Sequence, residues 1–240
     1  MILLIVYINY LIFYWNFGSL IYSIPLFILF FGGIFWIIKK SKKIIPDRRN
    51  NTVYEIKYTL TSFIIFFTVV FCYFSALEKG IIHFDFNFHI WSGILWIFFI
   101  ILHDAYFYAI HRFLHTKFMM KHVHRVHHKS NPSNIWSSYS FHPIEAIFYA
   151  GVSSIIFILD VNIYALLFAI FYNDFFTILG HCGYELFGSR IKNTWFHKYC
   201  ATTTYHDVHH SYNNGNIWLY FIYLDLLFET KSKDTEIVFD

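Results

Sequence analysis

Long apolar runs alternate with short polar segments along the chain, and the lengths of the runs predict the elements they build. Residues 58–77 form an uncharged run about as long as a helix needs to cross a hydrocarbon core. A second run, residues 90–115, re-enters the membrane and leads into a polar, histidine-rich stretch that extends to about residue 143. Two further apolar runs follow at roughly residues 144–159 and 161–180. The pattern predicts a bundle of membrane-spanning helices.

The last two apolar runs are separated by turn residues, because Asp160 and Asn162 interrupt the hydrophobic sequence between them. The two runs therefore form a predicted hairpin that begins and ends on one membrane face. This arrangement places His142 and His181 at the same end of the hairpin.

The first 38 residues are almost entirely apolar and are too long for one straight span. A single helix of this length would extend about 57 Å at about 1.5 Å per residue, nearly twice a hydrocarbon core of about 30 Å. Two helices with a bend near residues 16–19 are therefore expected. The number of spans before Lys39 stays open. No basic segment precedes this run and no small-residue cleavage site follows it, so a signal peptide is not expected.

Composition agrees with a membrane protein and disfavours other classes. Hydrophobic residues make up 57% of the chain and charged residues only 14%, whereas soluble domains carry about 25% charged residues. Aromatic residues reach 24%, which suits contact with lipid. The net charge of +3 is too small to indicate nucleic acid binding. The three cysteines are widely spaced and include no C-x-x-C pair, so neither a disulfide framework nor a thiolate metal site is expected.

The basic residues are distributed unequally between the two predicted membrane faces. Of the 18 Lys and Arg residues, only Lys79 falls in the loop between the spans at 58–77 and 90–115. Positive residues concentrate on the cytoplasmic side of membrane proteins, so the opposite face, which carries the basic segment at residues 39–49, is predicted to be cytoplasmic. Of the 15 histidines, thirteen lie on this face or in the helix that leads to it, with His83 and His89 as the exceptions.

Histidine recurs with helical spacing on the predicted cytoplasmic face. Residues 111–115 read H-x-x-x-H, and the pattern H-x-x-H-H occurs twice, at residues 124–128 and 206–210. Residues three and four apart share a helix face, so each group directs its imidazoles toward one point, as a metal ion requires. Imidazole suits Zn, Cu, Fe and Ni. The eight side chains exceed the needs of one tetrahedral ion and therefore predict two ions: His111, His115, His124, His127, His128, His206, His209 and His210.

A different interpretation of these histidines is binding to anionic lipid headgroups, for which the lysines and histidines of residues 121–129 are suited. That interpretation does not predict a second copy of the spacing 82 residues later with few lysines beside it. His83, His89 and His122 are interpreted as polar residues at the membrane border. A zinc protease is not favoured, because the sequence contains no H-E-x-x-H. The metal interpretation is therefore preferred.

The three histidine patterns on a polytopic chain resemble the fatty acid hydroxylase and sterol desaturase superfamily. The resemblance runs from about residue 96 to residue 230. One departure is that the family usually ends in a Trp-Asp … Phe-Gly-Thr pattern, where this chain has Leu224 before Asp225 and Glu229 before Thr230. The segments that carry the resemblance are DAYFYAIHRFLH (104–115), HRVHHKS (124–130), HPIE (142–145), HCGYELF (181–187), YHDVHHSYNNGN (205–216) and LDLLFET (224–230).

The resemblance implies an all-α, polytopic helical bundle with a non-haem di-iron site that activates O2 at the cytoplasmic membrane face. It adds His181 as a ninth expected ligand, because relatives place a histidine at the end of the equivalent helix. His142 and His197 are weaker candidates. His103 lies about 12 Å along the helix from His111 at about 1.5 Å per residue and is not expected to be a ligand. The ligand set implied by the resemblance is His111, His115, His124, His127, His128, His181, His206, His209 and His210.

The implied activity is O2-dependent hydroxylation or desaturation of a lipid, with two iron ions as the cofactor and zinc able to substitute in purified protein. Fatty acyl, sphingolipid, sterol and related substrates all stay open. The sequence contains no haem, flavin or nicotinamide motif, so electrons are expected from an external donor such as cytochrome b5, ferredoxin or a reductase. The expected location is a bacterial inner membrane or the endoplasmic reticulum, and nucleic acid is not an expected partner.

Ligand histidines need acceptors for their second ring N–H. The carboxylates near the histidine patterns are candidates for this role, and the sequence does not rank them. They are Asp104, Glu145, Asp174, Glu185, Asp207 and Asp225.

A second function, from a different class, is a histidine-rich metal-binding membrane protein without redox activity, such as a zinc transporter or an inactive relative. A transporter places polar residues near the middle of the membrane, and Asn173 and Asp174 are the candidates. The predicted organisation is N-terminal transmembrane helices with a basic cytoplasmic loop at residues 1–90, a hydroxylase-like catalytic domain at 91–232, and a polar tail at 233–240.

Overall fold

The computed structural model describes residues 42–43, 51–87, 89–157, 159, 161–185, 194–213 and 215–235. The two helices predicted before Lys39, the predicted turn residue Asp160 and the last five residues of the predicted tail lie outside the described residues.

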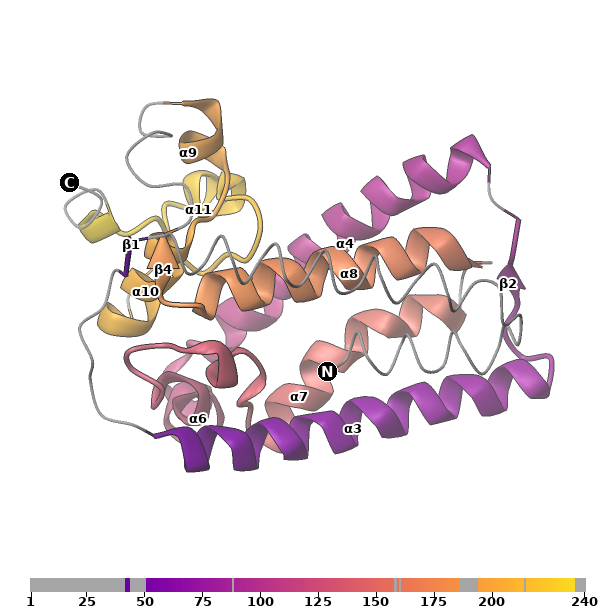
Figure 1. Cartoon of the computed structure of the whole chain (residues 1–240), viewed down its shortest axis with the longest axis horizontal. Coiled ribbons are helices and arrows are strands. Elements are labelled where there is room, and N and C mark those ends of the chain that lie inside the picture. The colour runs from indigo at the N-terminus through magenta and orange to yellow at the C-terminus, as the bar shows by residue number, and fades with distance from the viewer. Residues whose placement is uncertain are drawn as a thin grey trace.

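The structure has three long apolar helices: α3 (Thr52–Glu78), α4 (Ile90–Leu114) and α8 (Ile163–His181). α4 packs against α8, and α3 runs along the other side of the molecule, next to α7 (Pro143–Ala150) (Figure 1). Each of the three is long and apolar enough to cross a membrane. Large apolar side chains stay exposed on them, such as Phe71 at 73% and Trp91 at 64%. Water disfavours such a surface whereas acyl chains do not. The predicted all-α membrane bundle is therefore confirmed, and the chain is an integral membrane protein.

The structure of the apolar run at residues 144–159 differs from the prediction. The sequence predicted a helical hairpin arm similar in length to the second arm at residues 161–180. The structure has an eight-residue helix, α7 (Pro143–Ala150), followed by a 3₁₀ segment, η3 (Gly151–Phe157). The hydroxyl of Ser153 donates a hydrogen bond to the Ala150 carbonyl oxygen. Serine hydroxyls that bind nearby backbone compete with regular helix geometry, which accounts for the change at this point. The hairpin therefore has one short arm and one long arm, α8.

The end of the bundle away from the histidines is joined by two short strands. β2 (Phe84–Asp85), between α3 and α4, pairs in parallel with β3 (Val161–Asn162), which precedes α8. The Asn162 side chain accepts a hydrogen bond from the Ala165 N–H as the N-cap of α8, a role for which asparagine is favoured. Its amide donates to Asp85 Oδ2 at 3.0 Å. The predicted turn residue therefore also links the two hairpins.

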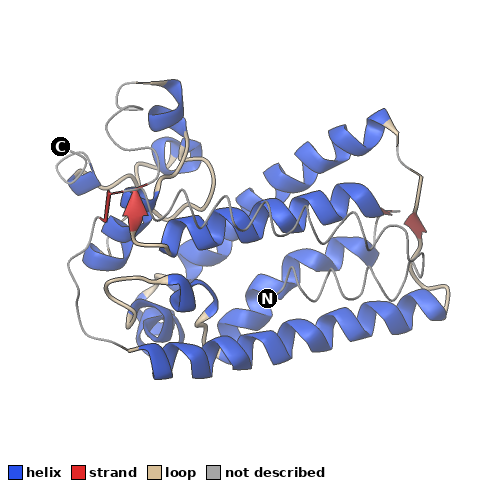
Figure 2. Cartoon of the chain, in the orientation of Figure 1, coloured by secondary structure: helices blue, strands red, loops and turns tan. Residues whose placement is uncertain are grey.

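Short elements gather at the opposite end of the bundle (Figure 2). A two-stranded antiparallel pair forms there between β1 (Lys42–Lys43) and β4 (Tyr184–Glu185). The other elements are α5 (Lys117–Met119), the π-helix η1 (Met120–His124), α6 (Arg125–His128), the 3₁₀ segment η2 (Ile135–Tyr139), α9 (Trp195–Tyr199), α10 (Thr203–Tyr212) and α11 (Tyr223–Leu227).

A buried aromatic cluster forms where α4 meets the segment at residues 217–222. Trp218 and Tyr220 are almost fully buried, and the Trp218 ring lies 5.4 Å from that of Tyr108, centroid to centroid. The backbone N–H of Tyr220 donates to Asp104 Oδ1 at 3.4 Å. Aromatic packing of this kind stabilises more than its buried area alone. The cluster fixes the C-terminal part of the chain, and with it α10, against α4.

Candidate metal centre

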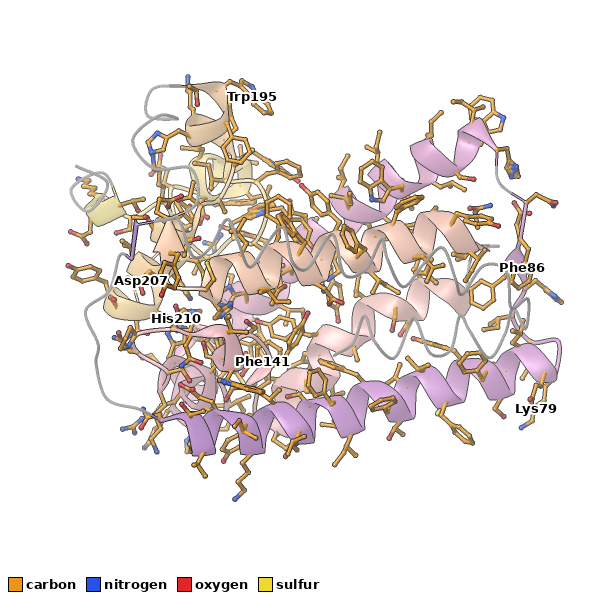
Figure 3. The ribbon with its side chains drawn as sticks, viewed as in Figure 1. Lys79, Phe86, Phe141, Trp195, Asp207 and His210 are labelled. Carbon is orange, nitrogen blue, oxygen red and sulfur yellow. The ribbon has the colours of Figure 1, made fainter. Side chains whose placement is uncertain are left out.

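Nine histidines converge in two groups at the end of the bundle that carries the short elements, and within each group the candidate ligand atoms lie within 4.8 Å of one another. Figure 3 places His210 and Asp207 at this end, with Lys79 and Phe86 at the opposite end. The five-histidine group contains His111, His115, His124, His128 and His209, and the four-histidine group contains His127, His181, His206 and His210. These are the nine side chains that the sequence predicts as ligands, and the structure brings all of them together.

The two H-x-x-H-H motifs are shared between the two groups. In the first motif, His124 and His128 belong to the five-histidine group, whereas His127 belongs to the other. The second motif does the reverse, because its outer pair joins the four-histidine group and His209 joins the five-histidine group. Helical positions i and i+4 lie about 40° apart, whereas i+3 lies about 60° to the other side of i. Each motif can therefore serve two centres, one on each side of its helix.

Hydrogen bonds to backbone carbonyls define the protonation of three rings. Nδ1 of His181 lies 2.7 Å from the Thr177 carbonyl oxygen, and Nδ1 of His209 lies 2.7 Å from that of Gly215. Nδ1 of His111 similarly contacts the Ile217 carbonyl oxygen. A carbonyl oxygen only accepts hydrogen bonds, so each ring carries its proton on Nδ1 and presents the lone pair of Nε2 to the group.

The inward-facing nitrogens of His111 and His124 lie at hydrogen-bond distance from each other, although neither carries a proton. Nδ1 of His124 donates to Glu145 Oε1 at 2.8 Å, so its Nε2 also carries a lone pair, and this atom lies 3.1 Å from Nε2 of His111. Two lone pairs at this distance repel unless a cation lies between them. The donor set therefore fits a metal ion of the kind that imidazole prefers, with its second nitrogens held by outer acceptors as metal-binding histidines require.

Burial keeps these rings uncharged. Eight of the nine are buried, and His115 is half-buried. Burial lowers the pKa of His209 to about 4. Burial, with an added contribution from His209, lowers the pKa of His115 to about 3. For His124 and His206, burial holds the pKa well below its ordinary value. At neutral pH the rings are therefore uncharged, and each has one unprotonated nitrogen that can bind a metal.

Among the carboxylates that the sequence suggested as hydrogen-bond acceptors for ligand histidines, Glu145 contacts the candidate ligand His124 directly. Asp225 supports His111 indirectly, through the backbone of Ile217. Its Oδ1 accepts a hydrogen bond from the N–H of Ile217, and the carbonyl oxygen of Ile217 accepts one from Nδ1 of His111. The hydroxyl of Tyr205 donates to Asp225 Oδ2 at 2.6 Å. Asp225 thus connects the position of α10 to the orientation of a ring on α4.

Glu185 and Asp174, two further candidate carboxylates, accept hydrogen bonds from hydroxyl and backbone groups. Glu185 Oε2 accepts from the N–H and the hydroxyl of Thr204 at 3.1 and 2.7 Å, near the start of α10. Asp207 is buried within α10. Asp174 accepts a hydrogen bond from the hydroxyl of Tyr139.

The remaining described histidines do not enter either group. His142, a weaker candidate, caps α7 by accepting from the N–H of Ile144 at 3.2 Å. His197 lies on α9, and His122 is exposed. His103 faces Tyr220, with Nδ1 3.0 Å from the tyrosine hydroxyl.

An apolar cavity of about 390 Å³ lies between α3, α4, α7 and α8 and extends to both histidine groups. His111, His127, His181 and His206 all line it, and most of the remaining wall is Phe, Leu, Ile and Val. This volume is within the range of pockets that bind small molecules. The sequence predicted lipid binding along the apolar helices but gave no location, because the wall is assembled from segments far apart in the chain.

These features define a class: an integral membrane protein in which paired histidine groups close one end of an apolar cavity. A family model described as fatty acid hydroxylase matches residues 96–230. The match covers more than half of the chain, and the chain belongs to the fatty acid hydroxylase family, as the histidine patterns predicted.

The chain is similar to a methylsterol monooxygenase from Arabidopsis thaliana, with 31% identity over 150 residues that cover 56% of this chain and 54% of the relative. It is 33% identical over 140 residues to a very-long-chain aldehyde decarbonylase from Oryza sativa subsp. indica, covering 56% and 51%. A Delta(7)-sterol 5(6)-desaturase from Gibberella zeae is 28% identical over 139 residues, covering 56% and 41%. The chain thus spans about half the length of the curated relatives it matches. No solved structure matches the chain significantly.

Proposed function

We propose that the chain is an O2-dependent, non-haem di-iron oxidoreductase that hydroxylates or desaturates a lipid held in the apolar cavity. The observation that carries the proposal is that this cavity extends to both histidine groups. A lipid lying in it would present a C–H bond to two metal ions at once. Membership of the family, and similarity to a monooxygenase and a desaturase, support the same class of reaction.

In this proposal the five-histidine group holds one ion and the four-histidine group holds the other. When bound, the iron pair supplies the chemistry that reduces O2 and oxidises the substrate. The protein contributes ligands whose Nδ1 atoms are fixed by Glu145 and by backbone carbonyls. These outer contacts would fix the orientation of the rings toward the ions.

Aromatic side chains exclude water beside the proposed ligands. The Phe107 ring lies 5.0 Å from that of His111, centroid to centroid, and the Phe141 ring lies 5.1 Å from that of His127. Both phenylalanines also line the cavity. A closed apolar site prevents side reactions with water, so these rings would restrict the oxidising chemistry to the bound lipid.

Electrons would come from an external donor of the cytochrome b5, ferredoxin or reductase type, approaching the histidine end of the bundle. This end exposes Lys117, Lys121 and Arg125, whereas Lys79 lies at the far end (Figure 3). The positive-inside rule supports a cytoplasmic orientation for the histidine end. The protein would then lie in a bacterial inner membrane or in the endoplasmic reticulum.

Metal analysis of anaerobically purified protein, combined with O2 uptake, tests the proposal. We expect about two iron ions per chain, one for each histidine group, and O2 consumption that requires both a reductant and a lipid. Zinc alone, with no O2 uptake under a supply of electrons, would instead support a metal-binding membrane protein without redox activity.

A further inference from the structure

The wall of the apolar cavity is interrupted by a group of hydrogen-bonding side chains that the proposed metal sites do not use. Five residues from α4, η2, α8 and the segment at 217–222 form it, and all of them line the cavity. We call this group the polar cluster: His103, Tyr139, Asn173, Asp174 and Tyr220.

Most hydrogen-bonding groups of the polar cluster are satisfied within it. The Tyr220 hydroxyl donates to Asn173 Oδ1 at 2.9 Å and lies 3.0 Å from Nδ1 of His103. The Tyr139 hydroxyl donates to Asp174 Oδ1, and the Asn173 amide lies 3.4 Å from the same oxygen. These contacts hold the side chains in defined positions before any ligand enters.

Asp174 Oδ2 is the exception. It has no hydrogen-bond partner among the described residues, and the residue is only 3% exposed. A polar atom buried without a partner destabilises the folded state. A hydrogen-bonding group on a molecule bound in the cavity would supply the missing partner.

The position of Asp174 on α8 sets the distance between the polar group of such a molecule and the nearest histidine group. Asp174 and His181 are seven residues apart on α8, which corresponds to two turns on one helix face, or about 10 Å along the axis. Thr177 lies between them on this face and receives Nδ1 of His181 on its carbonyl oxygen. A lipid whose polar group contacts Asp174, and whose apolar body extends along the cavity toward His181, would reach the four-histidine group.

We propose that Asp174 is a specificity-determining residue whose Oδ2 forms a hydrogen bond with a hydroxyl group of the lipid substrate. The substrate class is then a lipid alcohol, such as a sterol or a long-chain alcohol, that enters the cavity as a whole molecule. A hydroxyl both donates and accepts and adds little polarity, which suits one buried oxygen in an otherwise apolar wall. A phosphate group would meet no lysine or arginine among the described residues that line the cavity. This inference rests on the proposed function, because the bound alcohol is a substrate only if the protein is an oxidoreductase. Binding of the alcohol can be tested independently of that function.

The test measures lipid binding to metal-free protein in nanodiscs, using two matched pairs of probes: cholesterol with its 3-deoxy analogue, and octadecanol with octadecane. We expect wild-type protein to bind at least one alcohol about tenfold more tightly than its hydrocarbon, which is the effect of about one hydrogen bond. Preference for cholesterol would identify a sterol as the source of the hydroxyl, and preference for octadecanol would identify a linear alcohol.

Two variants isolate the role of Asp174. Asp174→Asn retains an oxygen for Tyr139 and turns an amide nitrogen toward the cavity, and Asp174→Leu removes the polar group entirely. Asp174→Leu should reduce the alcohol-to-hydrocarbon ratio toward one. Asp174→Asn, whose amide N–H can donate to the oxygen of the alcohol, should retain part of the preference and preserve the fold. Ile170→Leu, which changes the cavity wall outside the polar cluster, should leave the ratio unchanged.

Failure of this inference is distinguishable from failure of the proposed function. An equal preference for alcohols in wild type and in Asp174→Leu, or no preference in wild type, would overturn the inference even if the iron-loaded protein consumes O2. Selective binding of alcohols that depends on Asp174, in a protein that binds zinc and never consumes O2, would support the binding site and reject the oxygenase.

Discussion

Nε2 of His128 and Nε2 of His209 lie 3.2 Å apart, although the two residues are separated by 81 positions in the sequence. The contact joins the two H-x-x-H-H motifs within one histidine group. Since each motif also supplies the other group, neither group can be assembled from a single motif. The repeated spacing is thus explained by two centres that share two helices.

Replacing His181 tests whether the two groups bind metal separately. His181 belongs only to the four-histidine group, where Nε2 of His206 lies 3.0 Å from its own Nε2. We expect His181→Ala to keep about one metal ion per chain instead of about two and to lose turnover, as measured by elemental analysis and O2 uptake. His122→Ala, at an exposed position, is the matched control and should change neither quantity. Full metal content in His181→Ala would show that this residue is not a ligand.

Glu145 is expected to affect the metal through His124. Removal of its acceptor leaves Nδ1 of a buried ring without a partner and frees that ring to rotate. Loss of such an outer contact typically weakens metal affinity or activity by about ten- to a hundredfold. Glu145→Ala should show this loss in a chelator-competition assay. Glu145→Gln, which retains an acceptor oxygen, should lose less. Equal affinity in wild type and Glu145→Ala would mean that the contact does not support metal binding.

Acid should destabilise the metal-free protein in a defined window of pH. Burial lowers the pKa of His209 from 6.5 to about 4. Between these values the unfolded chain binds a proton at this residue and the folded chain does not, so the free energy of unfolding decreases as pH falls from about 6.5 to about 4. His115, whose pKa is about 3, extends the window to lower pH.

Thermal unfolding of metal-free protein in detergent measures this effect. The midpoint should be nearly constant above about pH 6.5 and should decrease below it, following the ordinary pKa of histidine. Metal-loaded protein should hold its midpoint to lower pH, because bound ions keep the rings unprotonated. A midpoint in the metal-free protein that does not change between about pH 7 and about pH 4.5 would contradict the buried, neutral state of the rings.

The orientation of the bundle can be tested by cysteine labelling. If the histidine end is cytoplasmic, a cysteine at the exposed position His83 at the far end should react with an impermeant thiol reagent in intact cells. Lys121→Cys, at the histidine end, should react only after permeabilisation. The exposed Cys72 on α3 is replaced by serine in both variants. The reverse pattern of labelling would place the proposed electron donor on the other side of the membrane.

The sequence predicted the parts of the molecule that depend on local spacing and hydrophobicity. The long apolar runs predicted α3, α4 and α8, because a helix that crosses lipid must satisfy its backbone internally and be apolar over its length. Histidine spacing predicted eight residues that the structure gathers in space, and the family resemblance added the ninth, His181. Their division into five and four was not predicted, because it depends on which neighbouring helix lies on each side of a motif.

Features that depend on contacts between distant segments could not be predicted from the sequence. Local composition did not predict that the run after Pro143 forms a short helix and a 3₁₀ segment. Asn173 and Asp174 were noted as polar residues near the middle of the membrane, but their partners Tyr139 and Tyr220 carried no signal in the sequence. Glu145, which contacts a ligand ring, could not be distinguished from the other five candidate carboxylates without the packing of α7 against η1.

The sharing of motifs between the two histidine groups has a consequence for biosynthesis. His206, His209 and His210 are the last of the nine histidines to emerge from the ribosome, and each group includes at least one of them. A nascent chain that has already inserted α3, α4 and α8 therefore has no complete group. Both groups can bind metal completely only after α10 has been synthesised, when the three membrane-length helices that precede it are already part of the chain.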